Sequence, residues 1–170
     1  MIRTIAITGA TGFIGGALTT RLKSAGWRIR ALVRSGSDHK RLNGTPVEWI
    51  TGDLGDRESL QRLVVGSDAI VHCAGAVRGG GQQDFDRVNA EGVERIVQVA
   101  AEQNVKPRFL LISSLAAREP QLSYYAASKQ KGEQALTSYS GDMFWGVFRP
   151  PAVYGPGDQE MRPLFQWMLR

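Results

Sequence analysis

The residue pair with the most direct chemical use is Tyr125 followed four positions later by Lys129. Residues four apart lie on one face of a helix, about one turn from each other. A tyrosine phenol has a pKa of about 10 and is a poor general acid or base at neutral pH. A lysine cation roughly 5 Å away, at an effective dielectric of about 20, favours the phenolate by about 3 kcal/mol. The spacing predicts a proton-transfer pair; a half-buried tyrosine beside an exposed lysine is the alternative. Tyr124 has only Ser128 at the same distance.

A turn with three glycines lies near the start of the chain, where Thr8 is followed by Gly9, Gly12 and Gly15 in the string TGATGFIG. The turn follows an apolar strand-like run and precedes an amphipathic helical pattern. Glycines in this position permit a tight turn and a close approach of the backbone to a pyrophosphate, which then lies at the positive end of the helix. In the strand–turn–helix context the pattern predicts dinucleotide binding, whereas three glycines alone would indicate only a turn.

The basic stretch from Arg28 to Arg41 indicates which dinucleotide binds. NAD enzymes usually place Asp or Glu at the end of the second strand for the ribose 2′-hydroxyl, and NADP enzymes place Arg there. Here Arg34 follows Val33, and a planar guanidinium suits a phosphate. NADP(H) is therefore favoured, and NAD(H) stays open if Arg34 only faces solvent. The net charge of +5 does not indicate nucleic acid, because the basic residues are not interleaved with aromatic ones.

These residues lie in a repeated alternation of β-branched runs and longer amphipathic segments, which is typical of βαβ units. Strands are expected at 4–8, 29–33, 47–50, 69–72, 108–113 and 144–148, and helices at 13–25, 57–64, 85–103 and 124–138. The pattern predicts an α/β fold with a doubly wound parallel sheet in strand order 3-2-1-4-5-6, a Rossmann fold. Residues 159–170 are expected to begin a further helix.

The composition is that of a globular protein of 170 residues, 42% of them hydrophobic and 22% charged. The single cysteine, Cys73, cannot form an internal disulfide, and its apolar neighbours favour a packed side chain over a reactive thiol. No apolar run approaches the ~18 residues of a membrane span, and Met1 leads directly into a strand-like run, so a cytoplasmic protein without a membrane segment is expected. His39 and His72 have no cluster of carboxylates or thiols beside them, so no metal site is expected.

The glycine spacing G-x-x-G-x-x-G in this string resembles the signature of the extended short-chain dehydrogenase/reductase family, which includes NAD-dependent epimerases, dehydratases and related reductases. Further motifs that resemble the family follow in order along essentially the whole chain: Gly52-Asp53-Leu54, His72-Cys73-Ala74-Gly75, Asn89, Ser113-Ser114, Tyr125-Ala126-Ala127-Ser128-Lys129 and the run from Arg149 to Gly157. The resemblance implies hydride transfer at a nicotinamide, with a Ser-Tyr-Lys relay for the proton.

The resemblance also implies roles for individual residues. Tyr125 passes the proton, and a serine orients the substrate oxygen. Lys129 lowers the pKa of Tyr125 and holds the nicotinamide ribose. The spacing to Tyr125 favours Ser114 over Ser113 for that serine. Asn89 either supports the relay or is an ordinary polar helix residue. The catalytic residues are thus expected to be Ser114, Tyr125 and Lys129, and the cofactor contacts Gly9, Thr11, Gly12, Phe13, Ile14, Gly15, Arg34, Asp53, Leu54, Ala74, Gly75, Lys129, Pro150 and Val153.

Alternatives stay open for the adenine contacts and for the reaction. Asp53 and Leu54 resemble the pair that contacts the adenine, but Asp53 could equally be a turn residue. The reaction implied is NADP(H)-dependent carbonyl reduction, with epimerisation or dehydration of a nucleotide sugar left open. A non-catalytic cofactor-binding sensor or assembly protein is the alternative from another class, because fold alone does not separate the two.

The family resemblance also predicts how the chain divides. Residues 1–158 are expected to form the dinucleotide-binding domain, and residues 159–170 to begin an incomplete substrate domain. The chain alone is then expected to bind the cofactor without turnover. Association into a homo-oligomer is a further expectation from the apolar side chains of this last segment, Leu164, Phe165, Trp167 and Met168.

Overall fold

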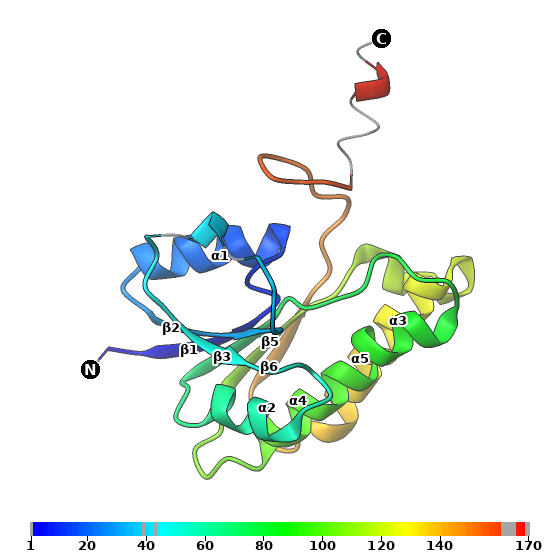
Figure 1. Cartoon of the computed structure of the whole chain (residues 1–170). Helices are drawn as coiled ribbons and strands as arrows, with labels where there is room; N and C mark the ends of the chain where they lie inside the picture. The colour runs from blue at the N-terminus through cyan, green and yellow to red at the C-terminus, as the bar shows by residue number, and fades with distance from the viewer. Residues whose placement is uncertain (1, 39, 43, 161–165, 169–170) are drawn as a thin grey trace.

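A computed structural model describes residues 2–38, 40–42, 44–160 and 166–168 of the chain. Short strands alternate with helices along it (Figure 1). The strands are β1 (Thr4–Thr8), β2 (Arg28–Val33), β3 (Val47–Thr51), β4 (Ala69–His72), β5 (Arg108–Ile112) and β6 (Trp145–Phe148). The α-helices are α1 (Phe13–Ser24), α2 (Arg57–Val64), α3 (Gln82–Asn89), α4 (Glu91–Ala101) and α5 (Tyr124–Tyr139). Short 3-10 helices are η1 (Lys40–Leu42), η2 (Leu115–Arg118) and η3 (Pro120–Leu122).

The strands form one parallel sheet in the order β3-β2-β1-β4-β5-β6, which confirms the predicted Rossmann topology. The central strand β1 pairs with β2 on one side and with β4 on the other. The chain reverses its direction of travel across the sheet between these two neighbours. Ligands of such sheets bind at this switch point, beyond the carboxyl ends of the strands.

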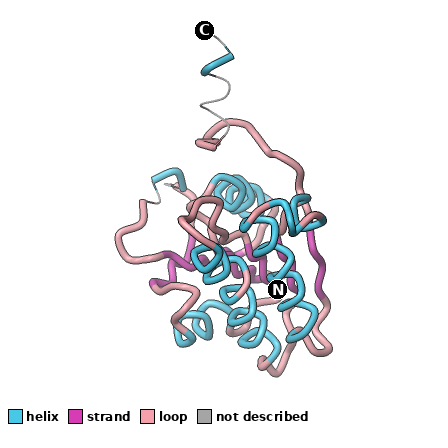
Figure 2. Tube along the Cα trace, turned by 90° about the vertical axis from the view of Figure 1, so that its right-hand side faces the viewer, coloured by secondary structure: helices cyan, strands magenta, loops and turns pink. Residues whose placement is uncertain are grey.

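Helices cover the two faces of the sheet unequally. The helix α1 packs on one face, where Ile5, Ile7 and Ile29 are buried with its partly buried Leu18 and Leu22. The opposite face packs against α2, α4 and α5 in a larger core (Figure 1). Figure 2, turned by 90°, shows the strands between these helices. Because β1 and β4 are covered on both faces, their sequences are almost continuously apolar.

The side of the sheet that α1 occupies is less well covered at β5 and β6. Along β5 the side chains alternate between exposed and buried, so that Leu110 is 37% exposed while Leu111 is buried. The paired strand β6 ends in Phe148, which is 59% exposed. Among the described residues, these apolar side chains therefore have little cover on this side.

Several predicted elements differ from the structure. The helix expected over 85–103 is two helices, α3 and α4, separated at Ala90. The carbonyl oxygen of Asn89 lies against Gly132 of α5, where an added Cβ would be 2.1 Å from it, so the helices meet at this break. The strand ends of β2, β3, β5 and β6 differ from the predicted ones by one residue. Most of the helix expected after residue 159 lies outside the described residues, including Leu164 and Phe165, but residues 166–168 are helical, with Trp167 and Met168 exposed.

Candidate active site

The turn after β1 is built so that only glycine fits at two positions. Gly9 has a φ of +71°, and a Cβ there would lie 2.6 Å from the backbone nitrogen of Ala74. A Cβ on Gly15 would lie 2.1 Å from the carbonyl oxygen of Gly9. The turn is closed by the backbone N–H of Gly12, which donates to the carbonyl of Gly9 at 3.0 Å. The helix α1 is thereby drawn tightly against the carboxyl ends of β1 and β4.

The N-terminus of α1 suits an anion. Its N-cap residue is Gly12, no side chain caps the first turn, and that turn carries no acidic residue. Free backbone N–H groups and the helix dipole make such an end a phosphate site. Thr11, Phe13 and Ile14 line the same cleft as the glycines. The residues present therefore fit the pyrophosphate of a dinucleotide.

The loop after β4 is fastened to this turn through Thr8. The Thr8 hydroxyl accepts from the backbone N–H of Ala74 at 3.2 Å and hydrogen-bonds Nδ1 of His72 at 2.9 Å. Burial, with a smaller contribution from the Lys129 charge, lowers the pKa of His72 to about 3, so the ring is neutral at physiological pH. No group of three or more His, Cys, Asp or Glu among the described residues could hold a metal ion, and His39 lies outside them. Thr8 and His72 thus position Ala74, and Gly75 beyond it lines the cleft.

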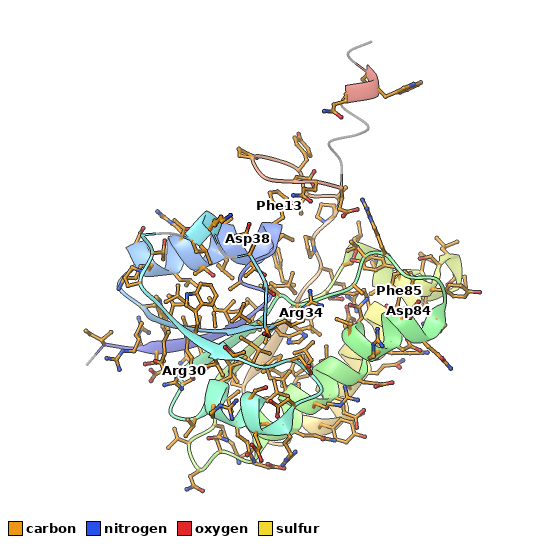
Figure 3. The ribbon with its side chains drawn as sticks, in the orientation of Figure 1. Phe13, Arg30, Arg34, Asp38, Asp84 and Phe85 are labelled. Carbon is orange, nitrogen blue, oxygen red and sulfur yellow. The ribbon has the colours of Figure 1, made fainter. Side chains whose placement is uncertain are left out.

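The end of β2 presents an exposed guanidinium. Arg34 follows the last residue of β2 and is exposed, and its carbonyl accepts from Ser37 in a tight turn at 3.1 Å (Figure 3). Within the described part of the chain no ion pair or hydrogen bond engages its guanidinium. Arg30, in contrast, donates to the carbonyls of Arg62, Leu63 and Val65 at the C-terminus of α2. Arg34, directly after this strand, therefore differs from Arg30 in having an exposed side chain, and its contact with a phosphate remains a prediction.

The adenine-contacting pair predicted from the resemblance lies at the end of β3. The carboxylate of Asp53 accepts from the backbone N–H of Gly55 at 2.6 Å, so it serves the turn into α2. Leu54 is partly buried, with its Cδ1 2.7 Å from where a Cβ on Gly92 would lie. Neither residue lines the cleft described here. Their contact with adenine remains a prediction.

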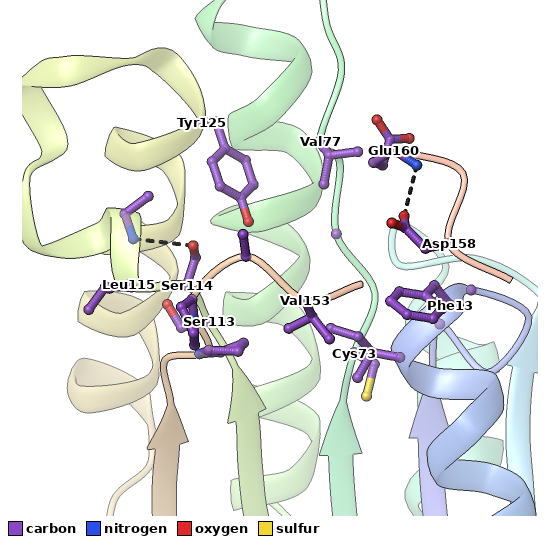
Figure 4. A pocket seen from close by; sticks show the side chains of 18 of the residues that line it. Phe13, Cys73, Val77, Ser113, Ser114, Leu115, Tyr125, Val153, Asp158 and Glu160 are labelled. Carbon is purple, nitrogen blue, oxygen red and sulfur yellow. Dashed lines mark hydrogen bonds between the residues drawn. The ribbon is translucent and has the colours of Figure 1, made fainter. Parts of the chain in front are cut away.

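The glycine turn, Ser114 and Tyr125 line one cleft of about 990 Å³. Tyr125 lies in the first turn of α5, where Ser123 caps the helix by accepting from the Ala126 N–H at 3.0 Å. Its ring meets Phe85 edge to face, with 6.3 Å between centroids. Figure 4 shows its hydroxyl directed into the cleft, toward the side that carries Ser114.

The two adjacent serines differ in what their hydroxyls do. The Ser113 side chain is buried and donates to the carboxylate of Glu133. The Ser114 hydroxyl accepts from the Ala116 N–H at 3.2 Å at the start of η2, and it is less buried (Figure 4). Both residues line the cleft. The engagement of Ser113 leaves Ser114 as the serine whose hydroxyl can still donate to a bound oxygen.

Lys129 is buried one helical turn after Tyr125. Its ammonium donates to the carbonyl of Ile112 at 2.8 Å, and only 6% of the residue is exposed. Burial lowers the pKa of Lys129 from 10.5 to about 8, and the nearby Glu133 and Cys73 act in the opposite direction. The lysine is therefore still mostly protonated at neutral pH, although it does not itself line the cleft.

Asn89 and Cys73 have structural surroundings. The Asn89 amide donates to the Ala76 carbonyl and to the Ser128 hydroxyl, both at 2.9 Å, and accepts from the Ala76 N–H at 2.8 Å. It therefore ties the loop after β4 to α5. Cys73 lines the cleft, but burial raises the pKa of its thiol to about 12 against the effect of Lys129, so the thiol is not a nucleophile at neutral pH.

The segment after β6 completes the cleft. Pro150 and Val153 both line it, and their contact with a cofactor remains a prediction. The sequence did not single out the apolar residues Val77, Leu115 and Leu122 on its rim, which are 55%, 46% and 75% exposed. It also missed Glu133, although Glu133 follows Lys129 at the same four-residue spacing that places Lys129 after Tyr125. That helical repeat was a usable signal.

Comparison with known proteins agrees with this geometry. The model of the NAD dependent epimerase/dehydratase family matches residues 5–170. The chain is 45% identical over 166 residues to a ceramide reductase of Caulobacter vibrioides, which covers 98% of this chain and 51% of that protein. It is 28% identical over 178 residues to a 2-alkyl-3-oxoalkanoate reductase of Stenotrophomonas maltophilia, covering 94% of this chain and 53% of that protein.

The fold is shared with solved structures. WbmH of Bordetella bronchiseptica, solved in complex with NAD+, superposes with a TM-score of 0.86 at 24% identity and covers 99% of this chain and 63% of its own. The chain thus spans about half the length of the curated relatives it matches. Among its described residues, no helix combines the length and apolarity needed to cross a membrane.

Proposed function

This chain belongs to the NAD-dependent epimerase/dehydratase family, and we propose that it is the cofactor-binding part of an NADP(H)-dependent carbonyl reductase. The observation that carries the proposal is the convergence of the glycine turn, Ser114 and Tyr125 on one cleft, with Lys129 buried one helical turn behind Tyr125. In this proposal residues 1–158 bind the cofactor, and residues from 159 onward belong to the substrate-binding part.

Different segments fit different parts of the cofactor. The glycine turn and the uncapped N-terminus of α1 fit the pyrophosphate. Arg34 fits the 2′-phosphate, since an exposed planar guanidinium can bind two phosphate oxygens. Lys129, Pro150 and Val153 are assigned to the nicotinamide end, and Asp53 with Leu54 to the adenine. When bound, the reduced nicotinamide supplies the hydride for a carbonyl carbon.

Residues of the chain supply the proton that the reduction needs. Tyr125 donates its phenolic proton to the carbonyl oxygen, so that hydride on carbon and proton on oxygen together give the alcohol. The Lys129 cation stabilises the phenolate that remains, because opposite charges attract strongly in a buried site. Ser114 donates a hydrogen bond to the substrate oxygen and holds it in line with Tyr125. Cys73, with its raised pKa, takes no part.

The cleft favours an apolar carbonyl substrate over a nucleotide sugar. On its substrate side the exposed side chains of Val77, Leu115 and Leu122 are apolar. The charged residues that line the described cleft are Glu119, Asp158 and Glu160, of which Glu160 pairs with Arg78 outside the lining at 3.0 Å, and no lysine or arginine is among the lining residues. Acidic groups repel the diphosphate of a nucleotide sugar, whereas apolar ones bind a hydrocarbon chain. The reductase names of the ceramide and 3-oxoalkanoate enzymes are consistent with this substrate class.

The test is NADPH oxidation by protein that contains this chain, with long-chain 3-oxo compounds and nucleotide sugars as substrates. We expect turnover with the former, and its loss in Tyr125→Phe with the affinity for NADPH almost unchanged. Tyr125→Phe protein that kept most of its turnover would refute the relay. NADPH binding without turnover of any carbonyl compound would instead favour a non-catalytic sensor.

A further inference from the structure

Glu133 is a buried carboxylate that the proposed proton relay does not use. It is 8% exposed and lies on α5, one turn beyond Lys129. The Arg149 guanidinium holds it through two bonds, from Nε to Oε1 at 2.9 Å and from Nη2 to Oε2 at 2.5 Å. The Ser113 hydroxyl donates to Oε1 as well. A carboxylate so buried is retained at a cost in desolvation, which these three donors offset.

The donors come from segments that each carry part of the site. Ser113 directly precedes Ser114, and Arg149 directly precedes Pro150, which lines the cleft. The two segments also pair through their backbones, where Ser113 N–H donates to Phe148 at 2.8 Å and Leu115 N–H donates to Pro150 at 2.9 Å. Glu133 therefore joins the helix of Tyr125 and Lys129 to the ends of β5 and β6.

The negative charge of Glu133 stabilises the Lys129 cation, and the positive charge of Arg149 offsets only part of this effect. The Arg149 side chain is 45% exposed, so solvent screens its charge, whereas the Glu133 side chain is only 10% exposed. Lys129 has no carboxylate in direct contact among the described residues and donates only to the Ile112 carbonyl. The buried negative charge of Glu133 is thus the main acidic influence that opposes loss of the Lys129 proton.

We propose that Glu133 is a positioning residue for the nicotinamide half of the site, which holds Lys129 in its charged form and fixes the segment from Pro150 to Val153 against α5. This inference rests on the proposed function, because it assigns Lys129 and that segment to the nicotinamide. It goes further in separating the two halves of the site. The glycine turn and Arg34, which lie on the adenine side, do not touch the Glu133 contacts.

The first experiment compares Glu133→Gln with the unmodified chain by calorimetric titration of NADPH and of 2′,5′-ADP, which represents the adenine half alone. The amide keeps the shape of the carboxylate but removes its charge. We expect NADPH to bind roughly tenfold more weakly, the equivalent of about one pKa unit of lost charge interaction, and 2′,5′-ADP to bind unchanged. Glu102→Gln is the matched control, because it breaks an Arg–Glu pair with Arg57 on the surface.

The outcomes separate the inference from the proposed function. Equal weakening of both ligands, or no weakening of either, would overturn the positioning role while the cofactor proposal survives. Failure of the unmodified chain to bind 2′,5′-ADP or NADPH would refute the NADP(H) proposal, and with it the inference. If Glu133→Gln does not fold, Ser113→Ala keeps the ion pair and removes one donor, and it should weaken NADPH selectively as well; equal binding of NADPH would overturn the inference.

The second experiment follows the lysine side chains of ¹³C-lysine-labelled protein by NMR as pH rises. The groups that face Lys129 are Tyr125 and Glu133 from α5, His72 at the end of β4 and Cys73 directly after it, with Arg149 behind Glu133. We expect Lys129 to lose its proton at a lower pH in Glu133→Gln than in the unmodified chain, and at the same pH in Glu102→Gln. A titration unchanged by Glu133→Gln would overturn the electrostatic part of the role.

Discussion

Replacement of Lys129 by methionine should reduce the rise in the free energy of unfolding at alkaline pH, because the lysine lies in an environment that disfavours its charge. A pKa lowered from 10.5 to about 8 corresponds to about 3 kcal/mol against the charged form. Methionine fills a similar volume without a charge to desolvate. It removes the bond to the Ile112 carbonyl, whose loss lowers stability by a constant amount at every pH.

The sign of the effect follows from proton linkage. Below about pH 8 both the folded and the unfolded chain hold the Lys129 proton, and the buried cation lowers stability by its full amount. Between about pH 8 and about pH 10.5 the unfolded chain binds more protons than the folded one, so this lysine makes stability rise with pH. Relative to Lys129→Met, the unmodified chain should therefore gain about 2 kcal/mol between about pH 7 and about pH 9.5.

The assay is urea unfolding at a series of pH values, with both proteins in a Cys73→Ala background. That background is needed because burial raises the pKa of Cys73 to about 12. The neutral thiol therefore stabilises the fold, and this contribution falls as pH rises above the pKa of the thiol in the unfolded chain. The change is opposite in sign to that of Lys129. Lys131→Met is the matched control, since Lys131 is an exposed lysine two residues along α5 that pairs with Asp86. A stability difference that stays flat across the whole pH range would refute the buried-cation reasoning.

Three further predictions concern other parts of the site. Arg34→Asp should remove or reverse a preference for NADPH over NADH by about 1–3 kcal/mol, because a charge-assisted bond to phosphate becomes a repulsion; calorimetry showing equal affinities in the unmodified chain would contradict this. Gly15→Ala should abolish cofactor binding, since its Cβ would lie 2.1 Å from the Gly9 carbonyl, whereas Gly81→Ala, with open space around its Cβ and an extended backbone, should bind normally in the same titration. Asn89→Ala should lower the free energy of unfolding by about 2–4 kcal/mol in urea, because both backbone groups of Ala76 lose their partner; an unchanged midpoint would mean that water replaces the amide.

The sheet could be predicted from the sequence because its signals are local. The apolar runs of β1 and β4 and the helical period of α2 are each contained within a few residues, and their bounds agree with the structure. The strand order followed from the alternation of strands and helices. The break at Ala90 could not be predicted in this way, because the partners that commit Asn89 are Ala76 and Ser128, far from it in the chain.

The candidate site was predictable as a set of positions, but less so as a set of contacts. Spacing favoured Ser114 over Ser113, but it could not show the physical distinction between them, which lies in the bond from Ser113 to Glu133. The ion pair of Glu133 with Arg149 could not be predicted either, because the local sequence of α5 does not show which residue after β6 pairs with Glu133. The roles of Ser114, Tyr125, Lys129 and Arg34 remain predictions that the experiments above test.

The closed glycine turn has a consequence for how cofactor choice can be re-engineered. The atoms nearest to a Cβ built on Gly9 or Gly15 are backbone atoms, so these two positions tolerate no side chain and offer none to vary. A pyrophosphate is the same group in NAD and NADP, and the turn therefore cannot distinguish them. Under the proposed function, selection falls to a separate segment, the tight turn from Arg34 to Asp38 after β2. We therefore expect that this short segment can be exchanged between relatives, because its replacement leaves the turn after β1 unchanged.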